Sequence, residues 1–206
     1  MSMKPILFNT EMVRANLEDR KTNTRRLVKG YALEHMEIDT DGAIIGVYDQ
    51  NEGRVRSVMD FAPYQPGDIL YVRETWSTDA NGDYVYRANY GVTEDDSFPP
   101  SMFKWHPSIH MPKKAARLFL RVTDVMVERL QDIDDDGAKA EGANWCNGKH
   151  IGFEEKMRRS AVTRFAEIWN TTIKPADLEK YGWDANPWVW VIEYERISKE
   201  EALRNG

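Results

Sequence analysis

Cysteine is almost absent from this sequence, and its absence narrows the setting in which the chain works. The 206 residues include one cysteine, Cys146, so no disulfide can form within the chain. Small secreted domains commonly depend on disulfides, whereas proteins of reducing compartments do without them. The count therefore favours a reducing compartment. Because no histidine signature accompanies Cys146, a cysteine nucleophile is a remote interpretation.

Long hydrophobic runs are missing as well. No apolar stretch approaches the roughly 20 residues that a membrane-spanning helix needs. Residues 1–8 lack the apolar centre of a secretory signal peptide. We therefore expect a soluble, cytoplasmic protein with no membrane partner.

The chain also lacks a surplus of positive charge. Its 28 Lys and Arg residues face 34 Asp and Glu residues, which gives a formal net charge of −6. Proteins that bind a nucleic-acid backbone nonspecifically usually carry a basic excess. The balance argues against that class, although a local basic cluster could still bind one phosphate or one nucleotide.

Aromatic residues, in contrast, are plentiful. Seven Trp, nine Tyr and seven Phe occur in the chain, and large aromatic side chains dominate burial in small domains. A length of 206 residues supports one well-filled core better than two. Because no repeat or low-complexity linker interrupts the chain, we expect a single domain.

Hydrophobic periodicity predicts a mixture of helices and strands. The expected helices cover residues 10–20, with Thr10 as cap, 132–141, ending at Gly142, and 153–171. The expected strands cover residues 24–28, 44–48, 54–58, 69–74, 84–87, 116–130 and 188–197, with a hairpin joining the second to the third. A turn is expected at 66–68 and a long loop at 89–112. These elements predict an α+β fold on a mixed or barrel-like sheet of about six strands with flanking helices.

The most informative motif is Lys21-Thr22-Asn23-Thr24-Arg25-Arg26, at the predicted junction of a helix and a strand. It places an amine, two hydroxyls and two guanidinium groups within six residues. A hydroxyl three residues after a lysine is a candidate nucleophile beside a candidate base. Glu141 is the best candidate for the carboxylic acid that would complete the set.

These residue types suit hydrolysis of an acyl group from an aromatic amine. A threonine hydroxyl attacks only when a base takes its proton, and a lysine is that base only when neutral, a form that burial or neighbouring cations favour. Arg25 or Arg26 could supply the positive field, and an arginine could stabilise the oxyanion that forms at the amide. Glu141, if protonated, could give a proton to the departing amine.

Several of these residues also have a purely structural interpretation. The Lys-Thr motif could be a solvated strand edge in which Thr24 supports β-structure. Arg73 and Glu74 could form an internal ion pair or contact a substrate. The basic group at 113–117 could touch a phosphate or end a strand in solvent.

Three aromatic residues are candidates for stacking on a planar ligand: Phe8, Trp76 and Trp145. Burial is the safer interpretation of Trp76, because large aromatic residues are usually buried.

A metal site is not expected. His106 and His110 lie four residues apart, but Pro107 between them disfavours one regular helix, and no HExxH pattern occurs. The three aspartates at 134–136 suit the acidic start of a helix better than a calcium loop. The sequence therefore predicts no metal and no other cofactor.

These elements, in this order, resemble the ASCH family of the PUA-like barrel superfamily. Against the family pattern Gly-x-Lys-x-x-Glu-x-Arg, the chain keeps Lys21 and Arg26 but has Asp19 and Thr24 in place of glycine and glutamate. The run from 67 to 76 also resembles a stretch common in phage-borne members. The resemblance implies one domain over 1–197, with insertions near 77–112 and 147–180 and a frayed tail at 198–206.

The threonine narrows the resemblance to the small bacterial N4-acetylcytidine amidohydrolases, which carry Lys-Thr-x-Thr-x-Arg at this point. This subgroup implies a proton acceptor at Lys21, a nucleophile at Thr24 and a proton donor at Glu141, with Glu74 as the alternative donor. The residues expected to contact the nucleoside are Arg26, Arg25, Arg73, Glu74, Phe8, Asn9, Trp76 and Trp145.

Two other functions stay open. A PUA-like module could read a modified base in RNA or DNA without catalysis, and other ASCH-like proteins have been assigned ribonuclease activity. A reader needs a pocket and a basic rim but no nucleophile. The acidic net charge and the pair of Lys21 and Thr24 favour an amidohydrolase acting on N4-acylated cytosine nucleosides, with RNA as the alternative partner.

Because no ligand cluster is expected, hydrolysis of N4-acetylcytidine should survive the removal of metal ions. We expect the EDTA-treated, dialysed protein to release cytidine at the rate of untreated protein, as measured by liquid chromatography. A zinc hydrolase treated in parallel controls for effective chelation. Loss of turnover that zinc or manganese restores would contradict the prediction.

Overall fold

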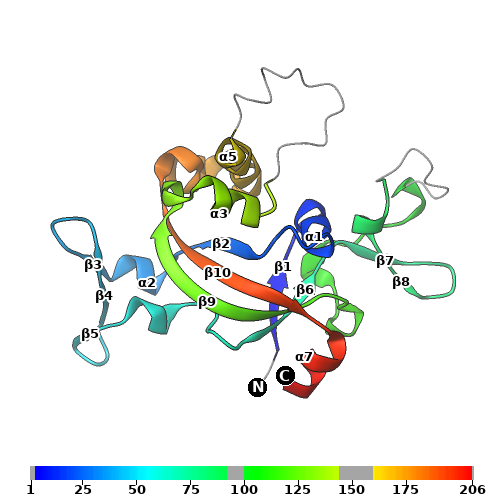
Figure 1. The fold of residues 1–206 in the computed structure, drawn as a ribbon, viewed down its shortest axis with the longest axis horizontal. Helices are drawn as coiled ribbons and strands as arrows, with labels where there is room; N and C mark the ends of the chain where they lie inside the picture. Colours follow the sequence, from blue (N-terminus) through cyan, green and yellow to red (C-terminus); the bar gives the residue numbers. More distant parts are fainter. Residues whose placement is uncertain (1–2, 92–99, 144–159, 206) are drawn as a thin grey trace. The chain divides into compact units, whose positions relative to one another are not determined.

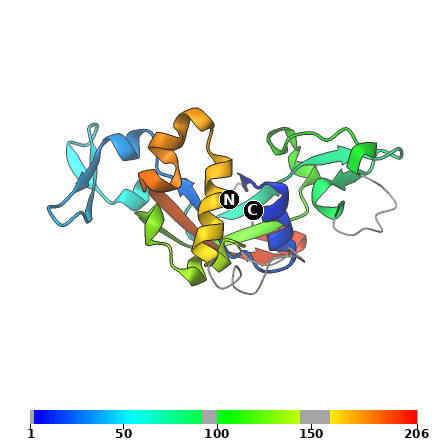
Figure 2. The same cartoon turned by 90° about the horizontal axis from the view of Figure 1, so that it is seen from above.

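The computed structural model describes residues 3–91, 100–143 and 160–205 of the chain. Within these residues the protein has a mixed α+β fold (Figures 1 and 2). Two compact units make up the chain: unit 1 is Met1–Thr22, Gly67–Val122 and Tyr194–Gly206, and unit 2 is Asn23–Pro66 and Thr123–Glu193. Among the helices of the described residues, none has the length and apolar character needed to span a membrane.

Five strands form the main sheet, in the order β1-β6-β9-β10-β2. Their bounds are β1 Lys4–Leu7, β2 Asn23–Leu27, β6 Ile69–Arg73, β9 Phe119–Arg129 and β10 Trp188–Ile197. Strand β1 runs parallel to β6, whereas β6 with β9 and β10 with β2 are antiparallel pairs. The sheet is therefore mixed, and β9 and β10 each contribute residues to both units.

In unit 1, helix α1 (Thr10–Leu17) follows β1 closely. Asn9 caps this helix by accepting a hydrogen bond from the Met12 N–H at 2.9 Å, so the expected cap at Thr10 is wrong by one residue. The turn before β6 has Gly67 at φ +90°, a conformation that favours glycine. Strands β7 (Trp76–Thr78) and β8 (Tyr84–Tyr86) form a separate hairpin.

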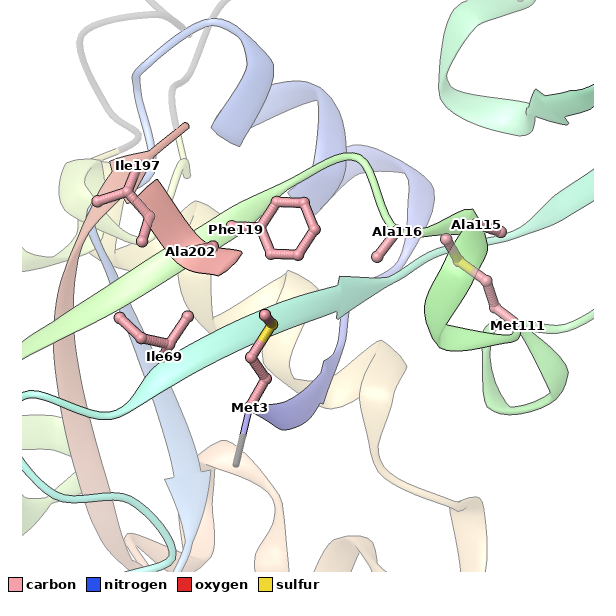
Figure 3. Close-up of a cluster of buried hydrophobic side chains, with 8 residues drawn as sticks. All are labelled: Met3, Ile69, Met111, Ala115, Ala116, Phe119, Ile197 and Ala202. Carbon is pink, nitrogen blue, oxygen red and sulfur yellow. The ribbon is translucent and has the colours of Figure 1, made fainter. Parts of the chain in front are cut away.

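A cluster of buried apolar side chains lies in unit 1 (Figure 3), consisting of Met3, Ile69, Met111, Ala115, Ala116, Phe119, Ile197 and Ala202. Ala202 belongs to helix α7 (Lys199–Asn205) and is 0% exposed. The expected frayed tail at 198–206 is therefore wrong for 199–205. The reason is a helix start at Ser198, whose Oγ accepts a hydrogen bond from the Glu201 N–H at 3.1 Å.

Unit 2 holds β2, a smaller sheet and several helices. The smaller sheet runs in the order β3-β4-β5, with bounds β3 Met36–Ile38, β4 Ile44–Asp49 and β5 Arg54–Arg56. The helices are α2 Tyr31–Glu34, α3 Asp135–Ala140, α5 Ala161–Thr172 and α6 Leu178–Tyr181. Helices α3 and α5 pack against each other, and α3 also contacts β2 (Figure 1).

The buried apolar cluster of unit 2 lies around α3 and α5. Its members are Leu130, Ile133, Ala138, Ala143, Ala161, Phe165, Trp169 and Val189. Short 3-10 turns in the described part of the chain are η1 Val58–Phe61, η2 Arg87–Asn89, η3 Pro100–Met102, η4 Ser108–His110, η5 Lys113–Ala115, η6 Leu130–Asp132, η7 Pro175–Asp177 and η8 Trp183–Ala185.

Most of the expected elements are confirmed. The hairpin at 44–58 is β4 and β5, and the strands expected at 69–74, 84–87, 116–130 and 188–197 are β6, β8, β9 and β10. The helix expected at 153–171 begins at Ala161, capped by Ser160, and residues 153–159 lie outside the described residues. Strands β1, β3 and β7 and helices α2 and α6 were not expected, because elements of three or four residues are too short to show a period.

Burial of α7 predicts that a charge at position 202 destabilises the fold. Ala202→Asp should lower the free energy of unfolding by roughly 3 kcal/mol, because it buries an unpaired carboxylate. Leu203→Asp is the matched control, since the adjacent Leu203 is 61% exposed and should change stability little. Urea unfolding followed by tryptophan fluorescence measures both variants. Equal stability of the two would show that this helix does not pack on unit 1.

Candidate functional site

The first residue of the motif is buried at the end of α1. Lys21 is 2% exposed, and its backbone N–H donates to the Ala15 carbonyl at 3.1 Å, which ties it to the last turn of the helix. Its Nζ atom lies 5.5 Å from the centroid of the Phe8 ring. Lysine is almost never fully buried without a specific partner. The burial of Lys21 therefore indicates a specific structural or chemical role for its side chain.

The residues preceding α1 have structural roles. Phe8 is 1% exposed, and its backbone N–H donates to the Arg73 carbonyl at 3.1 Å, so it belongs to the core of unit 1 as well as lying beside Lys21. Asn9, expected to contact a substrate, uses its side-chain oxygen to cap α1. The structure thus gives Asn9 a defined local role.

The second half of the motif forms β2 in unit 2. Thr24 is 0% exposed, and its Oγ1 accepts a hydrogen bond from Arg26 Nη1 at 3.0 Å. The same Nη1 donates to the Arg25 carbonyl at 3.1 Å. Side chains alternate along a strand, so Thr24 and Arg26 leave β2 on one face and Arg25 leaves it on the other.

Arg25 joins two glutamates inside unit 2. Its Nε and Nη2 atoms approach Oε1 of Glu128 on β9 at 2.8 Å and 2.7 Å, and its Nη1 lies 3.3 Å from Oε1 of Glu141. The side chains of Arg25 and Glu141 are 5% and 4% exposed, while that of Glu128 is 21% exposed. The expected acid Glu141 is therefore brought to a motif arginine, and Glu128 joins them.

Helix α3 sets the position of Glu141. Asp134 caps the helix by accepting from the Gly137 N–H at 2.7 Å, as the acidic start predicted. Glu141 is the C-terminal cap, and Gly142 follows at φ +84°. Because the helix ends at Glu141, its carboxyl is presented from a fixed backbone position.

Arg73 and Glu74 are not each other's partners. Arg73 donates from Nε to the Met111 carbonyl at 2.9 Å and from Nη2 to the Ile109 carbonyl. Glu74 is 1% exposed and forms a two-pronged pair with Arg117, at 2.8 Å and 2.9 Å. An ion pair between Arg73 and Glu74 is therefore wrong. Glu74 is paired instead with Arg117, a residue of the basic group expected to touch a phosphate or to end a strand in solvent.

Further contacts surround the ion pair of Glu74 and Arg117. Arg117 Nη1 donates to Asn89 Oδ1 at 3.0 Å, and its guanidinium carbon lies 4.0 Å from the centroid of the Tyr86 ring. Burial raises the pKa of the Tyr86 phenol, while the positive charge of Arg117 opposes the increase. The Tyr86 hydroxyl donates to the Ala115 carbonyl at 2.7 Å. This set of contacts stabilises unit 1 rather than offering free groups to a ligand.

Trp76 packs among other aromatic rings of unit 1. Its ring centroid lies 5.6 Å from that of Tyr84 and 5.0 Å from that of His106. It also contacts the buried cluster of unit 1, which agrees with the safer interpretation of this residue. Trp145 and Cys146 lie outside the described residues.

Sequence reasoning missed Glu128 as a partner of Arg25 and Arg117 as a partner of Glu74. The partners are far apart along the chain, since Glu128 is 103 positions from Arg25 and Arg117 is 43 positions from Glu74. One feature of the sequence could have identified Glu128: it is an acidic residue near the end of the strand predicted over 116–130. An acidic side chain that is buried there needs a cation beside it. Within the residues that the structure describes, no group of three His, Cys, Asp or Glu side chains could hold a metal ion.

The buried pair in unit 1 predicts a large stability effect. Arg117→Ala leaves the Glu74 carboxylate buried without its partner, and we expect a loss of about 3 kcal/mol or more in the free energy of unfolding. Lys114→Ala is the matched control, because Lys114 is an exposed cation of the same segment. Urea unfolding of both variants measures the difference. A loss below about 1 kcal/mol for Arg117→Ala would place the pair among ordinary surface salt bridges.

Comparison with known proteins adds little to this geometry. No protein-family model matches the chain, and no curated protein matches it. Among solved structures, the chain is similar to protein EF3133 from Enterococcus faecalis V583, with the family model DUF984, at 11% sequence identity and a TM-score of 0.41. The match covers 96% of this chain and 82% of that one. A similarity this weak supports no conclusion about fold or activity.

Proposed function

We propose that this protein is a metal-independent amidohydrolase that removes acyl groups from the exocyclic amine of N4-acylated cytosine nucleosides. Lys21 is the proton acceptor, Thr24 the nucleophile and Glu141 the proton donor. The proposal includes the fold assignment that the resemblance implies, an ASCH-type, PUA-like barrel domain over residues 1–197. The observation that carries it is the hydrogen bond from Arg26 Nη1 to Thr24 Oγ1.

That hydrogen bond suits a nucleophile. In the part of the chain that the structure describes, Thr24 Oγ1 accepts from a guanidinium and donates to no neighbour, so the hydroxyl proton is available to a base. A positively charged donor stabilises the negative charge that grows on the oxygen as its proton leaves. A threonine that only supported a strand would need no such donor.

Lys21 is the natural base because of its place in the chain. Thr24 is three positions further along the chain, so the α-carbons of the two residues lie at most about 10 Å apart. An amine acts as a base only in its neutral form, which burial favours, and Lys21 is 2% exposed. These features support the assignment of Lys21 independently of the resemblance.

Glu141 is preferred over Glu74 as the donor. Glu74 is held by two hydrogen bonds from Arg117, which is itself bonded to Asn89. Glu141 belongs to unit 2 together with Thr24, and its Oε1 lies 3.3 Å from Arg25 Nη1. A carboxyl held by both prongs of an arginine, as Glu74 is, is poorly suited to exchanging a proton.

The proposed reaction has two steps. Thr24 Oγ attacks the acyl carbon while Lys21 takes the hydroxyl proton, and the carbon–nitrogen bond then breaks as Glu141 gives a proton to the departing amine. Cytidine leaves, and the acyl group remains as an ester on Thr24. Water hydrolyses the ester, releasing a carboxylic acid and restoring the threonine hydroxyl.

Substitutions at position 24 test the nucleophile. With N4-acetylcytidine, Thr24→Ala should lower kcat by about a thousandfold or more, whereas Thr24→Ser keeps the oxygen and should lose far less. Lys21→Ala should resemble Thr24→Ala, and the double variant should be little worse, because groups acting as one unit are not additive. Cytidine release is followed by liquid chromatography, and thermal unfolding confirms that the variants fold.

The outcomes separate the competing functions. Near-normal turnover by folded Thr24→Ala would remove Thr24 from the mechanism. Binding of N4-acetylcytidine by the wild-type protein without cytidine release would favour a noncatalytic reader of modified bases. Cleavage of RNA strands, with the free nucleoside left intact, would favour a ribonuclease.

A further inference from the structure

The Arg25 guanidinium is shared unequally between its two glutamates. Two of its nitrogen atoms, Nε and Nη2, approach one oxygen of Glu128 at 2.8 Å and 2.7 Å, whereas Glu141 receives one contact at 3.3 Å. A planar guanidinium with a fixed fork of donors can serve two carboxylates at once, which a lysine ammonium does less well. Arg25 is thus anchored on Glu128 and presents its remaining side to Glu141.

Packing keeps this arginine in one place. Its guanidinium carbon lies 5.8 Å from the centroid of the Phe165 ring of α5. On the side of α3, a Cβ added at Gly137 would lie 3.3 Å from Arg25 Nη2, closer than ordinary van der Waals contact. The backbone of α3 at Gly137 therefore packs closely against the guanidinium.

The donor groups of Arg25 are already occupied by glutamates. Its side chain is 5% exposed, and each of its three nitrogen atoms contacts a glutamate oxygen. A direct substrate contact, expected for Arg25 from the sequence, does not fit this placement.

We infer that Arg25 and Glu128 are positioning residues for Glu141: Glu128 anchors Arg25, and Arg25 fixes where the Glu141 carboxyl lies. This inference rests on the proposed function for the role of Glu141, but the physical coupling from Glu128 to Glu141 stands apart from it. Arg25 divides one positive charge and one set of N–H donors between the Glu128 and Glu141 side chains, so a change at Glu128 alters how closely Arg25 holds Glu141. Glu128 thereby acts on the proton donor through the arginine.

The kinetic test compares two substrates that differ in their leaving group. Arg25→Lys and Glu128→Gln should lower kcat for N4-acetylcytidine, about a hundredfold for Arg25→Lys, with KM nearly unchanged. They should affect p-nitrophenyl acetate far less, because p-nitrophenolate leaves without a proton. Arg129→Lys is the matched control: this neighbour of Glu128 lies over the Trp188 ring at 4.2 Å and should leave both rates unchanged. Equal losses with both substrates would indicate general damage and overturn the inference.

A second measurement is independent of activity. In protein labelled with carbon-13 at glutamate carboxyls, the Glu141 resonance is assigned by its loss in Glu141→Gln. We expect Glu128→Gln and Arg25→Lys each to shift this resonance, while Arg129→Lys leaves it in place. If the wild-type protein releases no cytidine but the resonance shifts, the proposed function fails and the coupling holds. If Glu128→Gln leaves the resonance unmoved, the inference fails whatever the activity.

Discussion

A buried arginine that must satisfy two carboxylates is the constraint around which unit 2 is arranged. Arg25 on β2 needs Glu128 from β9 and Glu141 from the end of α3, because a buried charge without partners is strongly destabilising. The requirement fixes the approach of α3 to the sheet. At Gly137 of α3 an added Cβ would lie 3.1 Å from Asp134 Oδ1, 3.2 Å from Ile133 Cγ1 and 3.3 Å from Arg25 Nη2, so this part of the helix packs tightly beside the arginine.

Unit 1 contains a second buried carboxylate on an arginine, and the comparison separates structural from chemical use. Arg117 donates two hydrogen bonds to the Glu74 carboxylate, one to each oxygen, so Glu74 is held symmetrically. The Arg117 guanidinium also packs against the Tyr86 ring and donates to Asn89. Arg25 gives Glu141 one longer contact and reserves its shorter ones for Glu128. The same pair of residue types thus makes a two-pronged ion pair in unit 1 and an arginine shared between two glutamates in unit 2.

The sequence predicted the strands and helices that extend over many residues. It missed the short elements and the site residues that depend on partners far along the chain. Strand β10 was expected at 188–197 and has those bounds, since ten residues rich in Trp, Val, Ile and Tyr leave little ambiguity. The four residues of β1 show no such pattern and become a strand by pairing with β6, more than sixty positions away. The same holds for the candidate site. The local motif predicted Lys21, Thr24 and Arg26, whereas Glu128 is identified only by its contact with Arg25 in the structure.

The division of the chain into units has a consequence for how the protein is made. Unit 1 takes its residues from three separated stretches, the last of which is Tyr194–Gly206. As the ribosome releases the chain from its N-terminal end, β1 and α1 emerge long before Ile197 and Ala202, which complete their buried cluster. Unit 2 is interrupted in the same way by residues 67–122. Neither unit can complete its core before its last stretch has left the ribosome, so until then its apolar surfaces stay open to chaperones.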